Sequence, residues 1–97
     1  SQGPITRSAA FEKLSASLTV YPNPVRNEIN IEFSNPEAGV FTIGFYNIHG
    51  SLVKLIQSSK HAGRHREVIP VNDLSPGVYL VRAQQGEITE ALRIIKH

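Results

Sequence analysis

Cysteine, methionine and tryptophan are absent from this chain of 97 residues. Without cysteine the chain has neither a disulfide framework nor a thiolate metal site, so its composition does not indicate the redox state of its compartment. No apolar run approaches the roughly 20 residues that a membrane-spanning helix needs. The first residues also lack the charged and apolar regions of a signal peptide. Because no initiating methionine is present, we expect the chain to be a piece of a longer protein.

Charge is sparse and mixed in sign. Ten lysines and arginines stand against eight aspartates and glutamates, for a formal net charge of +2. The chain has no lysine or arginine run that could follow a phosphate backbone, so we expect no nucleic acid partner. A chain of about 100 residues forms one domain, which leaves no room for a conventional enzyme with a cofactor domain.

The chain does contain the pattern of β-strands. Isoleucine and valine outnumber leucine, and β-branched side chains favour pleated strands over helices. Ile29, Ile31 and Phe33 alternate with polar residues over residues 28–33, and residues 40–46 repeat the alternation. Further strands are predicted over residues 18–21, 52–57, 66–71, 78–83 and 88–96. About seven short strands separated by turns predict an all-β fold, an antiparallel β-sandwich.

Two of the connections carry clear turn signals. Pro22, Asn23 and Pro24 predict a rigid bend, because neither proline can donate to a strand ladder and both fix φ near −65°. Gly50 lies in a hairpin loop, where it can take a positive φ. Both segments are therefore expected to separate strands.

Other expectations concern the second half of the chain. Residues 58–64 are predicted as a polar loop and residues 84–87 as a turn. Val68 and Ile69 are expected to be the buried pair of their strand. The strand over residues 52–57 is apolar on both faces except at Lys54.

The beginning of the chain differs from the rest. Residues 1–18 are rich in serine and alanine and contain a Gly-Pro pair. This composition is typical of a linker. We therefore expect a linker over residues 1–18 and a folded domain over residues 19–97; the alternative is that residues 1–18 form a segment that docks on the domain.

Candidate metal-binding groups are few. His61 and His65 would share a face only on a helix, and Gly63 between them argues against a helix there. Asp73, the only aspartate, lies in a turn where its carboxylate can accept backbone N–H groups. We therefore expect no metal site.

Candidate catalytic groups are equally isolated. Glu28, Glu32 and Glu67 are predicted at outward strand positions, where no apolar pocket would raise a pKa for acid catalysis. The serines, including Ser75, lack a Gly-x-Ser-x-Gly elbow. We expect no catalytic residue, no cofactor and no small-molecule substrate, and so no enzyme.

The three tyrosines allow two interpretations. Tyr21, Tyr46 and Tyr79 would form a sugar-stacking strip if they emerged on one face. Tyrosines at strand positions of a small sandwich more often cover the edge of the core with the hydroxyl in water. The strip would indicate a carbohydrate-binding module, whereas the second arrangement is only structural.

Four segments, taken in order, resemble the type A C-terminal sorting domain of the type IX secretion system. They are residues 20–25 (VYPNPV), 46–50 (YNIHG, followed by apolar Leu52 and Val53), 74–81 (LSPGVYLV) and 92–96 (LRIIK). The similarity runs from about Leu18 to His97. The chain departs from the family in having Val25 and Arg26 where a Gly or Asn often follows the second proline, and in having Arg93 and a final histidine in a tail that is commonly lysine-rich.

The resemblance implies an immunoglobulin-like sandwich that serves as a C-terminal secretion signal in Gram-negative bacteria. The cargo would reach the periplasm, then pass through the type IX outer-membrane translocon to the cell surface or the medium. A sortase would remove the domain within residues 1–18 and attach the cargo to anionic lipopolysaccharide. The implied partners are the translocon, a shuttle protein and the sortase. The implied signal residues are Pro22, Asn23, Pro24, Gly50, Gly77, Tyr79, Arg93 and Lys96.

The last predicted strand, residues 88–96, suggests how such a signal is read. It ends at the C-terminus, so a partner could bind an open strand edge together with a basic terminus. An open edge would also let two copies of the isolated domain exchange strands as a homodimer. Alternatively, Leu92 and Ile94 only complete the sandwich.

Two other functions remain compatible with these residues. The domain would then be an accessory spacer or glycan-binding module, or an uncleaved sorting-type domain of a secretion-machine component. Export of a fused cargo distinguishes the sorting signal from the spacer, and the mass of the mature parent protein distinguishes cleaved from uncleaved domains.

Overall fold

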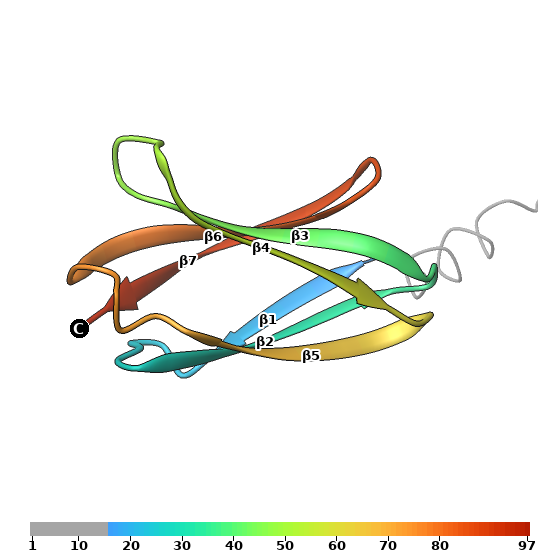
Figure 1. Ribbon diagram of the computed structural model, residues 1–97, viewed down its shortest axis with the longest axis horizontal. Helices are drawn as coiled ribbons and strands as arrows, with labels where there is room; N and C mark the ends of the chain where they lie inside the picture. The colour runs from blue at the N-terminus through green and yellow to red at the C-terminus, as the bar shows by residue number, and fades with distance from the viewer. Residues whose placement is uncertain (1–15) are drawn as a thin grey trace, which may run out of the picture.

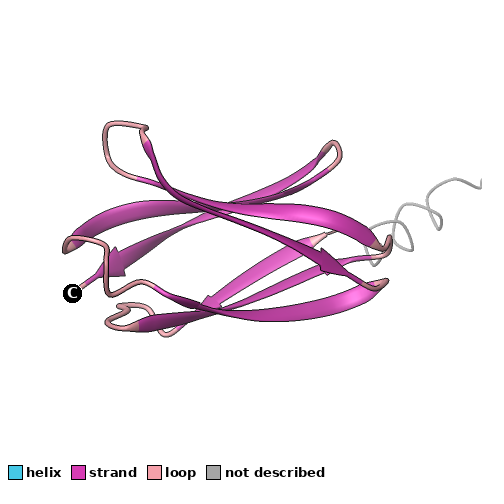
Figure 2. Ribbon diagram, in the orientation of Figure 1, coloured by secondary structure: helices cyan, strands magenta, loops and turns pink. Residues whose placement is uncertain are grey.

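The computed structural model describes residues 16–97, which form two antiparallel β-sheets packed face to face (Figure 1). The strands are β1 (Ser17–Tyr21), β2 (Glu28–Asn35), β3 (Gly39–Tyr46), β4 (Leu52–Lys60), β5 (Gly63–Pro70), β6 (Gly77–Gln85) and β7 (Ile88–Lys96). One sheet has the order β1-β2-β5 and the other β4-β3-β6-β7. Figure 2 shows strands and loops throughout this part of the chain. The all-β sandwich predicted from the sequence is confirmed.

The period-2 alternation of the sequence builds the core between the sheets. Phe33 of β2 and Phe41 of β3 face each other with ring centroids 5.3 Å apart. Each large apolar side chain that leaves water in this way contributes about 1.5–3 kcal/mol. The fully buried apolar side chains are Val25, Ile29, Ile31, Phe33, Phe41, Ile43, Phe45, Ile69, Val71, Val81, Ala83 and Ile94.

Two predicted connections are wrong in their extent. The polar loop expected over residues 58–64 is strand for most of its length, because β4 continues to Lys60 and β5 begins at Gly63. The turn expected over residues 84–87 is likewise shorter, since β6 continues to Gln85. Backbone pairing with a neighbouring strand carries these polar residues into the sheets, whatever their side-chain preference.

Polar side chains close the sandwich where these strands meet. The Lys60 ammonium is buried and donates to the carbonyls of Asn35, Glu37 and His61 at 2.9, 3.1 and 2.7 Å. Burial lowers the pKa of Lys60 below its usual value. Beside it, the Asn35 amide donates to Gln85 Oε1 at 2.9 Å. Because these polar groups find partners, they are tolerated inside the sandwich.

The buried pair predicted in β5 is half wrong. Ile69 is buried, as expected, but Val68 is 50% exposed. Consecutive residues of a strand face opposite sides of the sheet, so only one of the two can point into the core. The same alternation turns Glu67 inward and half-buries it, although the sequence predicted an outward position.

A β-bulge changes the direction in which the first side chain of β4 points. The register shifts between Phe45 and Tyr46 of β3, where Lys54 pairs with Phe45 and Leu52 with Tyr46. A bulge of this kind inserts an extra residue and reverses the facing of the residues beyond it. Residues 54–60 alternate regularly, so Lys54 points toward the interior and Leu55 outward, and the bulge turns Leu52 outward as well; both leucines are exposed.

Candidate functional site

The four segments that carry the resemblance lie at one end of the sandwich (Figure 1). This end, which we call the tail end, consists of the β1–β2 loop (residues 22–27), the β3–β4 loop (residues 47–51), the β5–β6 loop (residues 71–76) and residues 93–97. β1 begins at the opposite end of the molecule (Figure 1). Segments far apart in the sequence are therefore neighbours, and the chain enters the sandwich away from them.

Asn23 joins the β1–β2 loop to β7. Its Nδ2 donates to the Arg93 carbonyl at 3.3 Å, and its Oδ1 accepts from the Ile95 N–H at 2.9 Å. A carboxamide carries a donor and an acceptor much as a peptide group does. The Asn23 side chain therefore occupies the place of a neighbouring strand at the free edge of β7.

Val25 continues this pairing toward the C-terminus. Its N–H donates to the Ile95 carbonyl and its carbonyl accepts from the His97 N–H, both at 2.8 Å. The Val25 side chain is fully buried. Unpaired backbone groups at a strand edge need partners, and the loop supplies them. The open terminal edge expected from the sequence is thus wrong for residues 93–97.

The two basic residues of the tail point in different directions. Lys96 pairs with Gly77 of β6, is only 7% exposed, and donates from Nζ to the His97 carbonyl at 2.8 Å. Arg93 is exposed on the outer face of the four-stranded sheet, where it pairs with Leu80. The basic terminus expected from the sequence is therefore divided between the interior and this outer face.

Tyr79 fixes the β5–β6 loop to the core. Its ring is buried on the inner face of β6 opposite Ile94, and its hydroxyl donates to the Ser75 carbonyl at 2.6 Å. A tyrosine near the start of this strand, bonded to backbone a few residues upstream, is the tyrosine corner of immunoglobulin-like sandwiches. The sequence placed Tyr79 in the motif but did not reveal this hydrogen bond.

Replacing Tyr79 with phenylalanine should destabilise the domain without changing its core. The substitution leaves the Ser75 carbonyl without its donor, and we expect a loss of about 1 kcal/mol in the free energy of unfolding. Urea titration followed by circular dichroism measures it. Tyr21→Phe is the matched control, since its exposed hydroxyl binds Glu32, and it should cost less than about 0.5 kcal/mol. Equal losses for both variants would contradict the tyrosine-corner role.

Gly50 lies in the tight β3–β4 loop, as predicted. Its φ is 82°, a region that other residues adopt only with strain, so the predicted positive φ is confirmed. Asn47 organises the loop, because its Oδ1 accepts the N–H groups of His49 and Ser51 at 2.9 and 3.0 Å. Gly50 and Asn47 thus give this loop a defined conformation at the tail end.

Besides the backbone hydrogen bond expected from the sequence, Asp73 has a side-chain partner. The Lys54 ammonium, which lies on the inward side of β4, is 3.1 Å from Asp73 Oδ2. This hydrogen bond is the main reason that the pKa of Asp73 lies below its usual value. The pair fastens β4 to the β5–β6 loop. The sequence did not identify it because Lys54 and Asp73 are far apart in the chain.

A serine, a histidine and a glutamate meet between β4 and β5, but not as a catalytic triad. Glu67 Oε1 accepts from Ser58 Oγ at 3.0 Å and lies 2.7 Å from His65 Nε2. The carboxylate, rather than the imidazole, accepts from the serine, so the histidine does not occupy the position of the general base in a triad. The contacts link the strands instead.

The other candidate functional groups do not come together in one site within the described residues. Within residues 16–97, no group of three or more His, Cys, Asp or Glu side chains could hold a metal ion. No helix of the described part is long and apolar enough to cross a membrane. Tyr21 and Tyr46 lie on the outer faces of different sheets and Tyr79 lies in the core, so they do not form the sugar-stacking strip.

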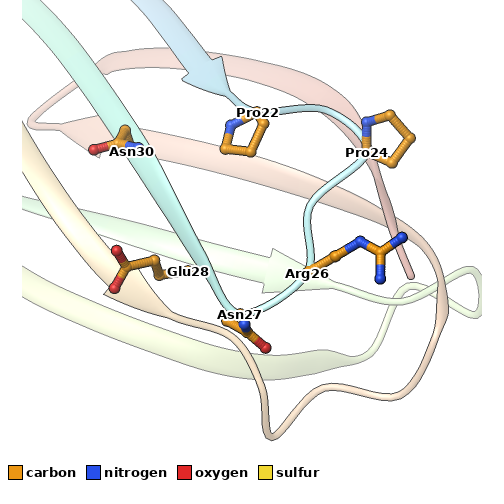
Figure 3. A pocket seen from close by; sticks show the side chains of 6 residues that line it. All are labelled: Pro22, Pro24, Arg26, Asn27, Glu28 and Asn30. Carbon is orange, nitrogen blue, oxygen red and sulfur yellow. The ribbon is translucent and has the colours of Figure 1, made fainter.

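A shallow hollow lies beside the β1–β2 loop. Figure 3 shows its lining, which is Pro22, Pro24, Arg26, Asn27, Glu28 and Asn30. The hollow has one charge of each sign and neither a nucleophile nor a pair of carboxylates. It therefore offers a contact surface at the tail end rather than a catalytic site.

Comparison with known proteins identifies one family. The model of the secretion system C-terminal sorting domain matches residues 19–97, a range that includes all four segments at the tail end. No similar sequence is found among curated proteins. The match thus rests on the family model.

Proposed function

Because the chain belongs to the secretion system C-terminal sorting domain family, it carries a non-catalytic type IX sorting signal, and we propose that this signal directs a cargo protein from the periplasm through the outer-membrane translocon to the cell surface. The observation that carries the proposal is the meeting of four distant segments at the tail end. A signal read as a folded shape needs such an assembly, because no single segment is specific by itself.

The hydrogen bonds between the β1–β2 loop and β7 support a signal that is recognised in its folded form. Asn23 and Val25 hold residues 93–97 in a defined conformation. Pro22 and Pro24 flank Asn23 and restrict the loop that presents it. The proposed signal residues Tyr79 and Lys96 are buried beneath this assembly, and Gly77, which is exposed, pairs with Lys96 at the start of β6.

The remaining steps of the proposal concern the other end of the domain. A surface sortase would cut within residues 1–18 and join the cargo to anionic lipopolysaccharide. The described part of the chain begins at the end opposite the tail end, and its longest dimension is 51 Å. The cut and the recognition of the tail end would therefore take place at separate surfaces, by the sortase and by the translocon or its shuttle protein.

Transplantation tests the proposal. The whole chain, fused to the C-terminus of an inert periplasmic protein, should bring that protein to the cell surface of a host with the type IX machinery. The same protein without the fusion, and the fusion in a strain without the translocon, should stay in the periplasm. A folded fusion that stays in the periplasm of the competent host would contradict the proposal.

The exported product also tests cleavage. Mass spectrometry should find a new C-terminus within residues 1–18 and an attached lipopolysaccharide. An intact domain on the exported product would instead support the alternative of an uncleaved sorting-type domain.

A further inference from the structure

The two outer faces of the sandwich have opposite character. On the three-stranded sheet, Tyr21 donates to Glu32 at 2.8 Å, and Arg64 and Arg66 extend the polar network around them. The outward positions of the four-stranded sheet hold two charged residues and no carboxylate. Their exposed large apolar side chains are Val40, Leu52, Leu55, Val78, Leu80 and Ile95. The second face, which we call the apolar face, is thus poorly suited to contact with water alone.

At the centre of the apolar face, the Tyr46 ring lies over Gly44. We call this part of the face the apolar floor. A Cβ atom on Gly44 would lie 2.9 Å from Tyr46 Cε1 and 3.2 Å from Leu52 Cδ1, so these side chains cover the glycine. Arg82 donates to the Tyr46 hydroxyl at 3.0 Å, and its guanidinium carbon lies 5.1 Å from the ring centroid. Any larger residue at position 44 would lift the ring. The position of the Tyr46 ring therefore depends on a glycine at position 44.

The apolar face continues to the tail end, and loops rise beside it. The β3–β4 loop and the β6–β7 hairpin rise from its two ends, away from the three-stranded sheet (Figure 1). Ile48, at the tip of the β3–β4 loop, is 74% exposed. A hollow at the foot of that loop is lined by Tyr46, Asn47, Ile48, Gly50, Leu80 and Arg82. Two proposed signal residues, Gly50 and Arg93, therefore belong to the border of this face.

We propose that the apolar face is the surface by which a protein of the secretion machinery binds the signal, and that the partner's surface is apolar and carries carboxylates. The inference rests on the proposed sorting function. The apolar floor supplies contact area, while Arg82 and Arg93 select a partner of negative charge. Planar guanidinium groups bind carboxylates by paired hydrogen bonds, which gives the contact its orientation.

Charge and area decide against two other occupants. A second copy would bring arginines against arginines, and a four-stranded face of roughly 500 Å² is smaller than the about 800 Å² per partner of a stable complex. An anionic bilayer typically recruits clusters of about four to eight Lys or Arg residues, whereas this face has two. A transient contact with an acidic, apolar protein surface fits both the small area of the face and its two positive charges.

Charge reversal in the export fusion tests the inference. Arg82→Glu with Arg93→Glu should reduce surface display about tenfold or more, because the partner's carboxylates are then repelled. Arg64→Glu with Arg66→Glu, the same change on the other sheet, is the matched control and should leave display within about twofold. The urea midpoint of each variant shows whether it is folded. Since Arg82 also holds Tyr46, Leu55→Thr provides a second variant that should lower display, with Val68→Thr as its control.

Crosslinking identifies the occupant. A photo-crosslinking amino acid in place of Leu55 should form an adduct with a machinery protein, on a peptide that contains carboxylates, and the same group at Val68 should not. An adduct with lipid or with a second copy, or equal adducts at both positions, would overturn the inference. Normal display of folded apolar-face variants would overturn it as well. If the wild-type fusion itself is not displayed, the proposed sorting function fails, and the inference fails with it.

Discussion

Removal of residues 93–97 is expected to unfold the domain. The truncation deletes Ile94, which is fully buried, and ends the β6–β7 pairing at Leu92. It also removes the partners of Asn23 and Val25 in the β1–β2 loop. We expect a loss of about 4–8 kcal/mol, which is comparable with the whole stability of a small domain.

Circular dichroism and urea titration of the purified domain measure this loss. A variant lacking only His97 is the control, because it gives up only the His97 N–H bond to Val25 and the His97 carbonyl that accepts from Lys96, and it should lose about 1–2 kcal/mol. A truncated domain that still unfolds cooperatively near the wild-type midpoint would show that β7 is dispensable for folding.

The same result affects the interpretation of export experiments. The tail was expected to be either an open signal or the completion of the sandwich, and the structure places it in the sandwich. A truncation that blocks export would therefore report unfolding as well as loss of a signal. Single substitutions at exposed Arg93 separate the two effects, whereas substitutions at buried Lys96 do not.

Val25→Ala should destabilise the domain far more than Val68→Ala. The Val25 side chain is fully buried between the β1–β2 loop and β7, so its truncation leaves a cavity and should cost about 2–3 kcal/mol. Val68 is half exposed on the outer face of β5, and the same truncation there should cost less than about 0.5 kcal/mol.

Urea midpoints of the two variants, measured side by side, check this ranking. The substitution is chemically identical, and Val68 rather than Val25 lies in a strand, so a larger loss at Val25 reports burial and not strand propensity. The opposite order, or equal losses, would mean that the β1–β2 loop does not pack against β7 in solution. The comparison is informative because the sequence assigned Val68 to the core and did not indicate that Val25 is buried.

The strands of the core were predictable because their sequence alternates. Ile29, Ile31 and Phe33 face inward with polar neighbours outward, and Phe41, Ile43 and Phe45 do the same. Alternation of this kind survives folding, since a shift of one residue would bury every polar side chain of the strand.

The polar ends of strands were not predictable in the same way. Residues 58–60 and 63–65 have little apolar character, yet they pair along the sheets because their neighbours provide backbone partners. Lys60 lies inside because three carbonyls accept its ammonium hydrogens. Such long-range compensation has no signal in the local sequence.

The candidate site was predictable as a set of residues but not as a surface. The order of four segments, from Pro22 to Lys96, was enough to indicate a sorting domain, and the family match agrees. The sequence could not show that Asn23 takes the place of a strand partner, or that Lys96 turns inward while Arg93 turns outward. These facts depend on which backbone groups meet after folding.

By itself, the sequence determined the strand pattern and the family, because both depend on local spacing and on the order of short segments. The tertiary structure alone decided which edge is closed and which face is apolar. The bulge between Phe45 and Tyr46 turned Leu52 outward to the same side as Leu55, and Val25 closed the edge of β7. Both outcomes arise from pairing between distant strands, where one inserted residue or one hydrogen bond reverses what a segment presents to a partner.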